Sequence, residues 1–259
     1  MNNNLFNLKD KVAVVTGASS GLGKRAAIAY ANYGADVVLL ARRLEKLEEV
    51  KQEITKIGRA CLTIKCDITK KEEVKEAVNT IINKFGHIDI LLNNAGIAIK
   101  GGVDTLEESE WDKSFNTNVK GIYLMSKYIV PHMKEKHYGK IINISSVNAV
   151  IADKEDIFIR HSYNASKSAV LGLTKAMACS YAKYGITVNA IGPGLFETEM
   201  TENTLFKSDE FLNIYNKLNP SNRPGYKEEV NGTIIYLSSD ASSYVQGQFI
   251  IIDGGASLV

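Results

Sequence analysis

The chain has 259 residues and a formal net charge of +2, with 45% hydrophobic and 23% charged residues. This length suits one large α/β domain or two small ones, and the composition is ordinary for a globular protein. Charge is nearly balanced, and basic runs are as short as Arg42-Arg43 and Lys70-Lys71, which excludes a long nucleic-acid-binding track.

The cysteines and the N-terminus bear on where the protein works. Cys61, Cys66 and Cys179 form an odd, sparse set without CxxC spacing, which argues against a disulfide scaffold or a zinc site and fits a reducing compartment. The N-terminus lacks the apolar core of a signal peptide, and no segment reaches the roughly 18 apolar residues of a membrane span. We therefore expect a cytoplasmic protein with no metal site, no nucleic-acid partner and no membrane association.

Short, mostly apolar runs alternate with longer amphipathic stretches along the chain. The expected strands are Val12–Val15, Asp36–Leu40, Cys61–Cys66, Ile88–Leu92, Lys140–Ile144, Thr187–Ile191 and Gln248–Ile252. The expected helices are Lys24–Tyr33, Leu44–Ile57, Glu72–Phe85, Glu108–Lys136, Ser166–Tyr184 and Lys227–Ser238. Strands without polar alternation are covered on both faces. The pattern predicts an α/β fold of Rossmann type, with a doubly wound parallel sheet of about seven strands and helices on both faces.

Residues 1–259 contain no linker or repeat, so we expect a single catalytic domain. Pro131, near the end of a helical pattern, is expected to break or kink that helix. Two stretches depart from the regular alternation: a loop at 147–162, and a helical excursion at 195–224. The second carries Phe196, Phe206, Phe211 and Tyr215.

A glycine-rich segment, Thr16–Gly23, joins the first strand to the first helix. Its glycines allow a tight turn and a close approach to a pyrophosphate, while the helix N-terminus offers free N–H donors and the positive end of a dipole. The spacing is GxxxGxG rather than GxGxxG, so the loop alone is also compatible with a packing role. Its place after the first strand of an α/β chain favours dinucleotide binding.

The end of the second strand bears on which dinucleotide is bound. Enzymes that prefer NAD commonly place an acidic residue here to bind the ribose 2′-hydroxyl. This chain has Arg42 and Arg43 instead, and Arg42 offers charge-assisted donors to a 2′-phosphate. The two arginines are also compatible with the solvated start of a helix. We predict NADP(H) as the cofactor in preference to NAD(H).

A tyrosine and a lysine, Tyr163 and Lys167, stand four residues apart and therefore share one helix face. A phenol with a pKa of about 10 is a poor proton shuttle at neutral pH, and a nearby ammonium group is expected to lower that pKa. The bare YxxxK pattern also fits a surface pair. A second polar element, Asn143-Ile144-Ser145-Ser146 at the end of the fifth strand, makes an active site the better interpretation.

With these motifs the chain resembles the classical short-chain dehydrogenase/reductase family over essentially its whole length. Six motifs in order carry the resemblance: Thr16–Gly23, Asn93-Asn94-Ala95-Gly96, Asn118-Val119-Lys120-Gly121, the set of Ser146, Tyr163 and Lys167, Pro193-Gly194 with Thr198 beyond it, and Asp253-Gly254-Gly255. The members most similar in type act on gluconate or on 3-oxoacyl carrier-protein substrates. The family also implies a homotetramer, in which the long helices Glu108–Lys136 and Ser166–Tyr184 pack against partner copies.

The resemblance implies four catalytic residues: Asn118, Ser146, Tyr163 and Lys167. Ser146 is preferred over Ser145, which becomes its structural neighbour, and Asn118 over Asn116. Asn93 is expected to tie strands together. The residues expected to bind the cofactor are Gly17, Ser19, Ser20, Gly21, Leu22, Gly23, Arg42, Arg43, Asp67, Ile68, Asn94, Ala95, Gly96, Tyr163, Lys167, Pro193, Gly194, Phe196 and Thr198.

The implied reaction passes a hydride between the nicotinamide and a carbonyl carbon while Tyr163 protonates the oxygen. Ser146 holds that oxygen by a hydrogen bond. Lys167 binds the nicotinamide ribose and depresses the pKa of the tyrosine, and Asn118 holds a water that links Lys167 to solvent. The cofactor carries the hydride chemistry, and the protein supplies geometry and electrostatics.

Two regions lie outside these motifs, so the motifs do not predict their roles. Between Ser146 and Tyr163 the chain is about four residues longer than the family pattern, with the extra length in Ile151–Arg160. Phe158 and Ile159 are candidates to wall the substrate pocket, and Arg160 or His161 to meet an anionic substrate, although His161 also fits a plain helix start. In 195–224, which resembles a substrate lid, we expect the aromatic residues to form the lid's own buried face, except Phe196 beside the nicotinamide.

The substrate remains open at this point. The first interpretation is a small keto or hydroxy compound such as a sugar acid. A 3-oxoacyl-[acyl-carrier-protein] reductase and a hydroxysteroid dehydrogenase are alternatives, although the acidic lid residues weaken the carrier-protein reading. A hypothesis of another class is a non-catalytic NADP-binding sensor on the same fold, against which the intact catalytic set argues.

Overall fold

A computed structural model describes residues 4–152, 158–198, 201 and 205–259. Its centre is a parallel sheet of seven strands in the order β3-β2-β1-β4-β5-β6-β7. The strands are β1 (Val12–Thr16), β2 (Asp36–Ala41), β3 (Cys61–Lys65), β4 (Ile90–Asn93), β5 (Gly139–Ile144), β6 (Ile186–Pro193) and β7 (Phe249–Ile252). The chain builds outward from β1 to β3 and then crosses to β4 on the other side. This reversal between β1 and β4 opens a crevice at the carboxyl ends of the strands.

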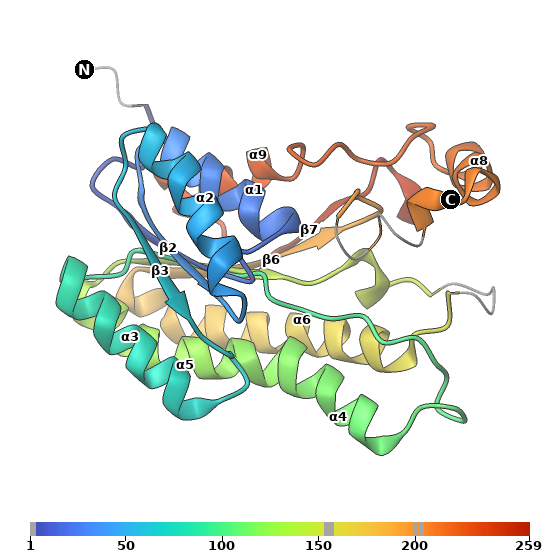
Figure 1. The fold of residues 1–259 in the computed structure, drawn as a ribbon, viewed down its shortest axis with the longest axis horizontal. Coiled ribbons are helices and arrows are strands. Elements are labelled where there is room, and N and C mark those ends of the chain that lie inside the picture. Colours follow the sequence, from blue (N-terminus) through green and yellow to red (C-terminus); the bar gives the residue numbers. More distant parts are fainter. Residues whose placement is uncertain (1–3, 153–157, 199–200, 202–204) are drawn as a thin grey trace.

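Helices cover both faces of the sheet (Figure 1). α1 (Gly21–Asn32), α2 (Leu44–Lys56) and α9 (Asn231–Ser238) lie on one face, and α3 (Lys71–Phe85), α5 (Gly121–Lys136) and α6 (His161–Tyr181) on the other. α4 (Glu108–Phe115) precedes α5, and α8 (Asp209–Leu218) lies at the crevice end. Within the described residues, no helix has the length and hydropathy needed to span a bilayer.

Strand β1 shows why the sheet is buried on both sides. Ala13 and Val15 pack into the core under α1 and α2, whereas Val12 and Val14 pack into the core under α3 and α5. Successive side chains of a strand point to opposite faces, so a run that is apolar throughout needs a layer on each side. The fold class predicted from the sequence is confirmed: a Rossmann-type α/β sheet with helices around it.

The long helix predicted over 108–136 differs from the prediction in two ways. A π-helical segment, Asn116–Lys120, separates α4 from α5. In addition, Pro131 does not end α5, which continues to Lys136. Pro131 lies on the exposed side, while Val130 and Met133 stay buried against the sheet. Packing of the inner face of the helix therefore compensates for the one backbone hydrogen bond that Pro131 cannot donate, and the helix continues.

Candidate active site

A cavity of about 2160 Å³ opens at the carboxyl ends of the strands. Its lining comes from the glycine loop, the ends of β2 to β6, the start of α6, and α8. Of the predicted site residues, those that line it are Gly17, Ser19, Ser20, Gly21, Leu22, Arg42, Arg43, Asp67, Ile68, Asn94, Ala95, Gly96, Ser146, Tyr163, Lys167, Pro193, Gly194, Phe196 and Thr198. The other two, Gly23 and Asn118, lie behind this lining.

The glycine loop is held by the Asn93–Gly96 segment. The hydroxyl of Thr16 accepts hydrogen bonds from the backbone N–H groups of Asn94 and Ala95, and the Asn94 amide donates to the Thr16 carbonyl. Gly17 has φ +66°, and a Cβ there would lie 2.9 Å from the Cα of Ala95. At Gly23 a Cβ would lie 2.4 Å from the Asn94 side-chain nitrogen. Glycine is therefore needed at both positions so that the two segments can interlock.

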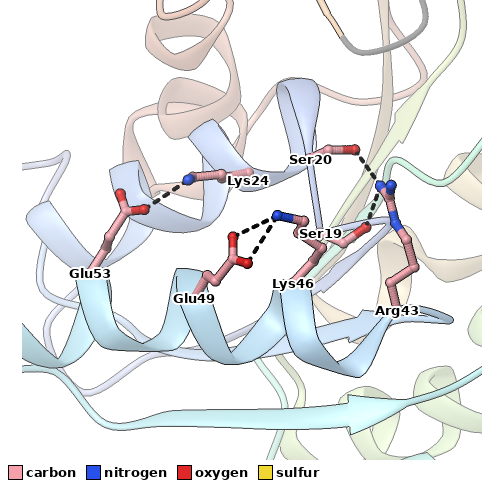
Figure 2. Close-up of polar contacts among 7 residues, drawn as sticks. All are labelled: Ser19, Ser20, Lys24, Arg43, Lys46, Glu49 and Glu53. Carbon is pink, nitrogen blue, oxygen red and sulfur yellow. Dashed lines mark hydrogen bonds and ion pairs between the residues drawn. The ribbon is translucent and has the colours of Figure 1, made fainter.

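Figure 2 shows how the second strand meets this loop through Arg43. Its guanidinium donates to the hydroxyls of Ser19 and Ser20 at 3.2 and 3.1 Å. The other cations drawn there, Lys24 and Lys46, pair with Glu53 and Glu49 on α2. Arg43 is thus the arginine fixed at the mouth of the loop.

Arg42 is exposed and acts on Asp67, which follows β3. Burial raises the pKa of the Asp67 carboxyl, but hydrogen bonds from the Thr69 N–H and hydroxyl and the charge of Arg42 outweigh it, so that this pKa lies below its ordinary value. Asp67 is therefore an ionised group of fixed orientation in the lining of the cavity.

The opposite end of the cavity brings together Ser146, Tyr163 and Lys167. Ser146 follows β5 and lies close enough to the Tyr163 hydroxyl to act on its pKa. Its own hydroxyl donates to Asn148 Oδ1 at 3.4 Å and accepts from the Asn148 N–H at 3.2 Å. Tyr163 and Lys167 lie in the first two turns of α6, which begins at His161, five residues earlier than predicted. Lys167 is 4% exposed, and its Nζ donates to the Ile144 carbonyl at 2.8 Å and lies 5.6 Å from the Tyr163 ring centroid.

The pKa values at this end differ from the prediction. Burial raises the pKa of Tyr163, and Ser146 and the charge of Arg160 offset this only in part. Burial also lowers the pKa of Lys167 to about 8. The expectation that Lys167 depresses the tyrosine pKa is therefore wrong for the free protein. The reason is that desolvation of the phenolate outweighs the attraction of any nearby charge.

Asn118 lies in the π-helical segment and is fully buried. Its Oδ1 accepts from the Ile97 N–H at 2.8 Å, and its Nδ2 donates to the Ile97 carbonyl and the Ser166 hydroxyl. A Cβ on Gly96 would lie 3.2 Å from both Asn118 Oδ1 and Lys167 Nζ. The missing side chain of Gly96 thus lets these two polar groups approach the same point. π-Helical turns often occur at functional sites.

Two other predicted assignments fit their surroundings. The Ser145 hydroxyl donates to the main-chain carbonyl of Lys167, consistent with a structural neighbour. Asn93 donates to Asn143 at 2.9 Å and so ties β4 to β5. Asn143 in turn donates to Thr174 on α6. Asn143 belongs to the polar element that the sequence places at the end of the fifth strand, and its contacts to Asn93 and Thr174 give it a structural role there.

The lid aromatics do not follow the prediction. In α8 none of the side chains is buried. Its apolar face lines the cavity, with Ile214 53% and Leu218 68% exposed. The residues of this face, spaced as on one side of a helix, are Phe211, Ile214, Tyr215 and Leu218. Phe196, expected beside the nicotinamide, lines the cavity but is 4% exposed and packs on Gly225.

The Asp253-Gly254-Gly255 motif anchors α8. Buried Asn219, just past the helix, donates to the Asp253 carbonyl and to the Tyr215 hydroxyl. The Ser221 hydroxyl donates to the Gly254 carbonyl. Sequence reasoning did not single out Asn219 or Ser221, because neither belongs to a local motif and both act only through contacts distant in sequence.

The lengthened loop before α6 is described in part, since 153–157 lie outside the described residues. Phe158 and Arg160 line the cavity, and the Phe158 ring lies 5.3 Å from that of Phe211. This supports the idea that Phe158 walls the pocket. His161 instead accepts from the Val103 N–H at 3.0 Å, so its imidazole fixes the start of α6.

The family model for short chain dehydrogenases matches residues 11–208. The chain belongs to the short chain dehydrogenase family. It is similar to a gluconate 5-dehydrogenase of Gluconobacter oxydans, with 38% identity over 98% of this chain and 97% of the relative. A 3-oxoacyl-[acyl-carrier-protein] reductase of Thermotoga maritima is 37% identical over 96% of this chain and 98% of its own length.

Among solved structures, a gluconate 5-dehydrogenase from Burkholderia cenocepacia in complex with NADP and tartrate is similar over 99% of this chain and 98% of its own. The TM-score is 0.93 at 33% identity. The chain is accordingly an oxidoreductase acting on CH–OH donors.

Proposed function

We propose that the chain is an NADP(H)-dependent oxidoreductase that interconverts a carbonyl and a secondary alcohol, with Tyr163 as the proton donor. The proposed substrate is a small keto or hydroxy compound such as a sugar acid. The observation that carries this proposal is the meeting of Ser146, Tyr163 and Lys167 at one end of a cavity whose other end is formed by the glycine loop and Arg43.

The residues present fit a bound dinucleotide. The close approach of Gly17 to Ala95 and the positive φ of Gly17 and Gly21 leave backbone exposed along the cavity, where a pyrophosphate would lie. Asp67 and Ile68 would hold the adenine end. The nicotinamide end would rest against Asn94–Gly96 and Pro193–Thr198. When bound, this cofactor supplies or accepts the hydride.

The protein's own part in the reaction is to position and protonate the substrate oxygen. The raised pKa of Tyr163 keeps its phenol protonated at neutral pH, which suits a proton donor in the reducing direction. The Ser146 hydroxyl, which lies beside that of Tyr163, would donate a hydrogen bond to the substrate oxygen. Lys167 would bind the nicotinamide ribose hydroxyls.

Proton resupply is proposed to pass through Asn118. An amide oxygen has two lone pairs, and the described residues supply a donor, the Ile97 N–H, to one of those on Asn118. Asn118 Oδ1 and Lys167 Nζ are each 3.2 Å from the Cβ position of Gly96, so they are near enough to share a bridging water.

The preference for NADP(H) is proposed to rest on Arg42 and Arg43. We predict that replacing either arginine with alanine raises the KM for NADPH about 10- to 100-fold and leaves the KM for NADH nearly unchanged, because each removes charge-assisted donors from a 2′-phosphate. Arg43→Ala should have the larger effect, since Ser19 and Ser20 preorganise its guanidinium. Steady-state kinetics with both cofactors measure this.

Lys46→Ala is the matched control, because Lys46 belongs to the same stretch but bonds Glu49 instead. It should leave both KM values as in the wild type. Equal increases for NADPH and NADH in the arginine variants would contradict a 2′-phosphate role.

The proposed activity is tested by a panel of carbonyl compounds scored by NADPH consumption: 5-keto sugar acids, 3-oxoacyl thioesters and steroid ketones. Turnover of the sugar acids is the expected result. A second candidate, 3-oxoacyl-[acyl-carrier-protein] reductase, is favoured by the apolar α8 face, which suits an acyl chain. Thioester turnover above that of the keto acids would select it.

We also predict a homotetramer. The outer side of α6 carries small exposed residues, among them Gly172 and Ala176, and a Cβ on Gly172 would have no neighbour within 4 Å. Such a surface allows close helix packing against a second copy. Light scattering coupled to size exclusion should give four times the 28.4 kDa of one chain. A monomer at micromolar concentration would contradict this prediction.

A further inference from the structure

The cavity lining includes a cationic side chain, that of Arg160, which has no role in the proposed reaction. Arg160 lines the cavity beside the catalytic end, is half-buried, and lies one residue before α6 and three before Tyr163. The described residues offer its guanidinium no carboxylate within ion-pair distance and no hydrogen-bond acceptor. A half-buried arginine without an anionic partner is unusual, because buried guanidinium groups are generally paired with a carboxylate or another anion.

The backbone on both sides of Arg160 is fixed. The Gly101 N–H donates to the Ile159 carbonyl at 2.9 Å, and the His161 N–H donates to the Gly101 carbonyl at 3.1 Å. The His161 ring adds a further bond, accepting from the Val103 N–H. The backbone of Arg160 is therefore held in place by hydrogen bonds on both sides. A binding residue needs such support if its geometry is to be set before the ligand binds.

Arg160 brings a positive charge to a cavity that is also lined by uncharged aromatic side chains. Its charge lies close enough to the Tyr163 hydroxyl to favour the phenolate, so the guanidinium is near the reacting atoms. On the other side, the paired rings of Phe158 and Phe211 offer no charge. The acids Asp112 and Glu210 also line the cavity but form no ion pair with Arg160.

We propose that Arg160 binds a carboxylate of the substrate and makes the enzyme selective for keto and hydroxy acids whose carboxylate lies a few bonds from the reacting carbon. A guanidinium matches a carboxylate with two parallel hydrogen bonds, which fixes orientation as well as affinity. This inference rests on the proposed function and names its substrate class.

The test compares 5-ketogluconate with the neutral ketose L-sorbose in NADPH-dependent reduction by the wild type and by Arg160→Gln, Arg160→Lys and Lys75→Gln. Lys75 is an exposed lysine on α3, outside the cavity lining, and serves as the control. Arg160→Gln should raise the KM for the keto acid about 10- to 100-fold and change that for L-sorbose less than about twofold. Arg160→Lys should recover part of the loss, because it restores the charge without the planar fork.

A second readout does not depend on turnover. Calorimetry of gluconate binding in the presence of NADPH, a pair between which no hydride can pass, should show affinity in the wild type and its loss in Arg160→Gln. Equal KM increases for both carbonyls, or an unchanged keto-acid KM with unchanged gluconate binding, would overturn the role of Arg160 while leaving the proposed oxidoreductase intact. A different result would overturn the proposed function alone: the wild type binds gluconate but reduces no carbonyl, and Arg160→Gln does not bind gluconate.

Discussion

Replacing Tyr163 with phenylalanine is expected to lower kcat for NADPH-dependent carbonyl reduction about 10²- to 10⁴-fold, the range that general acid catalysis contributes. The substitution removes the hydroxyl that lies beside Ser146 and keeps the ring at the start of α6. The loss should therefore fall on the chemical step rather than on folding. Steady-state NADPH consumption, with thermal unfolding as a check on the fold, measures it.

Tyr181→Phe is the matched control for this prediction. Tyr181 lies at the other end of α6, where its ring packs under the Lys134 ammonium at 4.7 Å. Its variant should keep the wild-type rate. A Tyr163→Phe enzyme with the rate of the wild type would contradict catalysis by Tyr163 and favour a non-catalytic NADP-binding protein.

Replacing Lys167 with methionine is expected to lower kcat/KM by at least about 10²-fold and, in the absence of cofactor, to stabilise the fold at neutral pH. Burial lowers the pKa of Lys167 to about 8 from an ordinary 10.5. The folded protein therefore holds a buried ammonium group at a cost of about 3 kcal/mol at pH 7. Methionine has a similar length and no charge to desolvate.

The sign of the pH dependence follows from proton binding. Between pH 8 and about 10.5 the unfolded state keeps the lysine proton that the folded state has lost, so the wild type gains stability as pH rises through this window. Lys167→Met lacks that gain. Its advantage over the wild type should be largest below pH 8 and shrink as pH rises to about 10.

Denaturant unfolding of both proteins at pH 7 and pH 10 measures this difference. Lys75→Met, on the exposed side of α3, should track the wild type at both values. A constant difference between Lys167→Met and the wild type across this range would contradict the depressed pKa.

The fold was predictable because its signals are local. Runs such as Asp36–Ala41 are apolar on every residue after the first, which only a strand covered on both faces requires. The two deviations, Pro131 within α5 and the π-helical turn at Asn118, depend on tertiary packing. The local sequence does not show how deeply Val130 and Met133 are buried, so it cannot predict that their packing outweighs the one hydrogen bond lost at Pro131.

The site was predictable where its residues belong to motifs of fixed spacing, as for Tyr163 and Lys167. Contacts made across the fold were not. The direction in which α8 turns Phe211 depends on how Asn219 and the Asp253 carbonyl hold its end. Likewise, Arg43 rather than Arg42 bonds Ser19 and Ser20, because the backbone direction leaving β2 decides which neighbour points at the loop.

Hydride transfer between a nicotinamide and a carbonyl carbon is the reaction that we propose for this cavity. It is tested most directly by reducing 5-ketogluconate with NADPH deuterated at the transferred position of C4 and analysing the product by mass spectrometry. The expected product is an alcohol carrying one deuterium on its carbinol carbon in the wild type, formed much more slowly by Tyr163→Phe. Product formed without deuterium at that carbon, or at the same rate in both proteins, would contradict it.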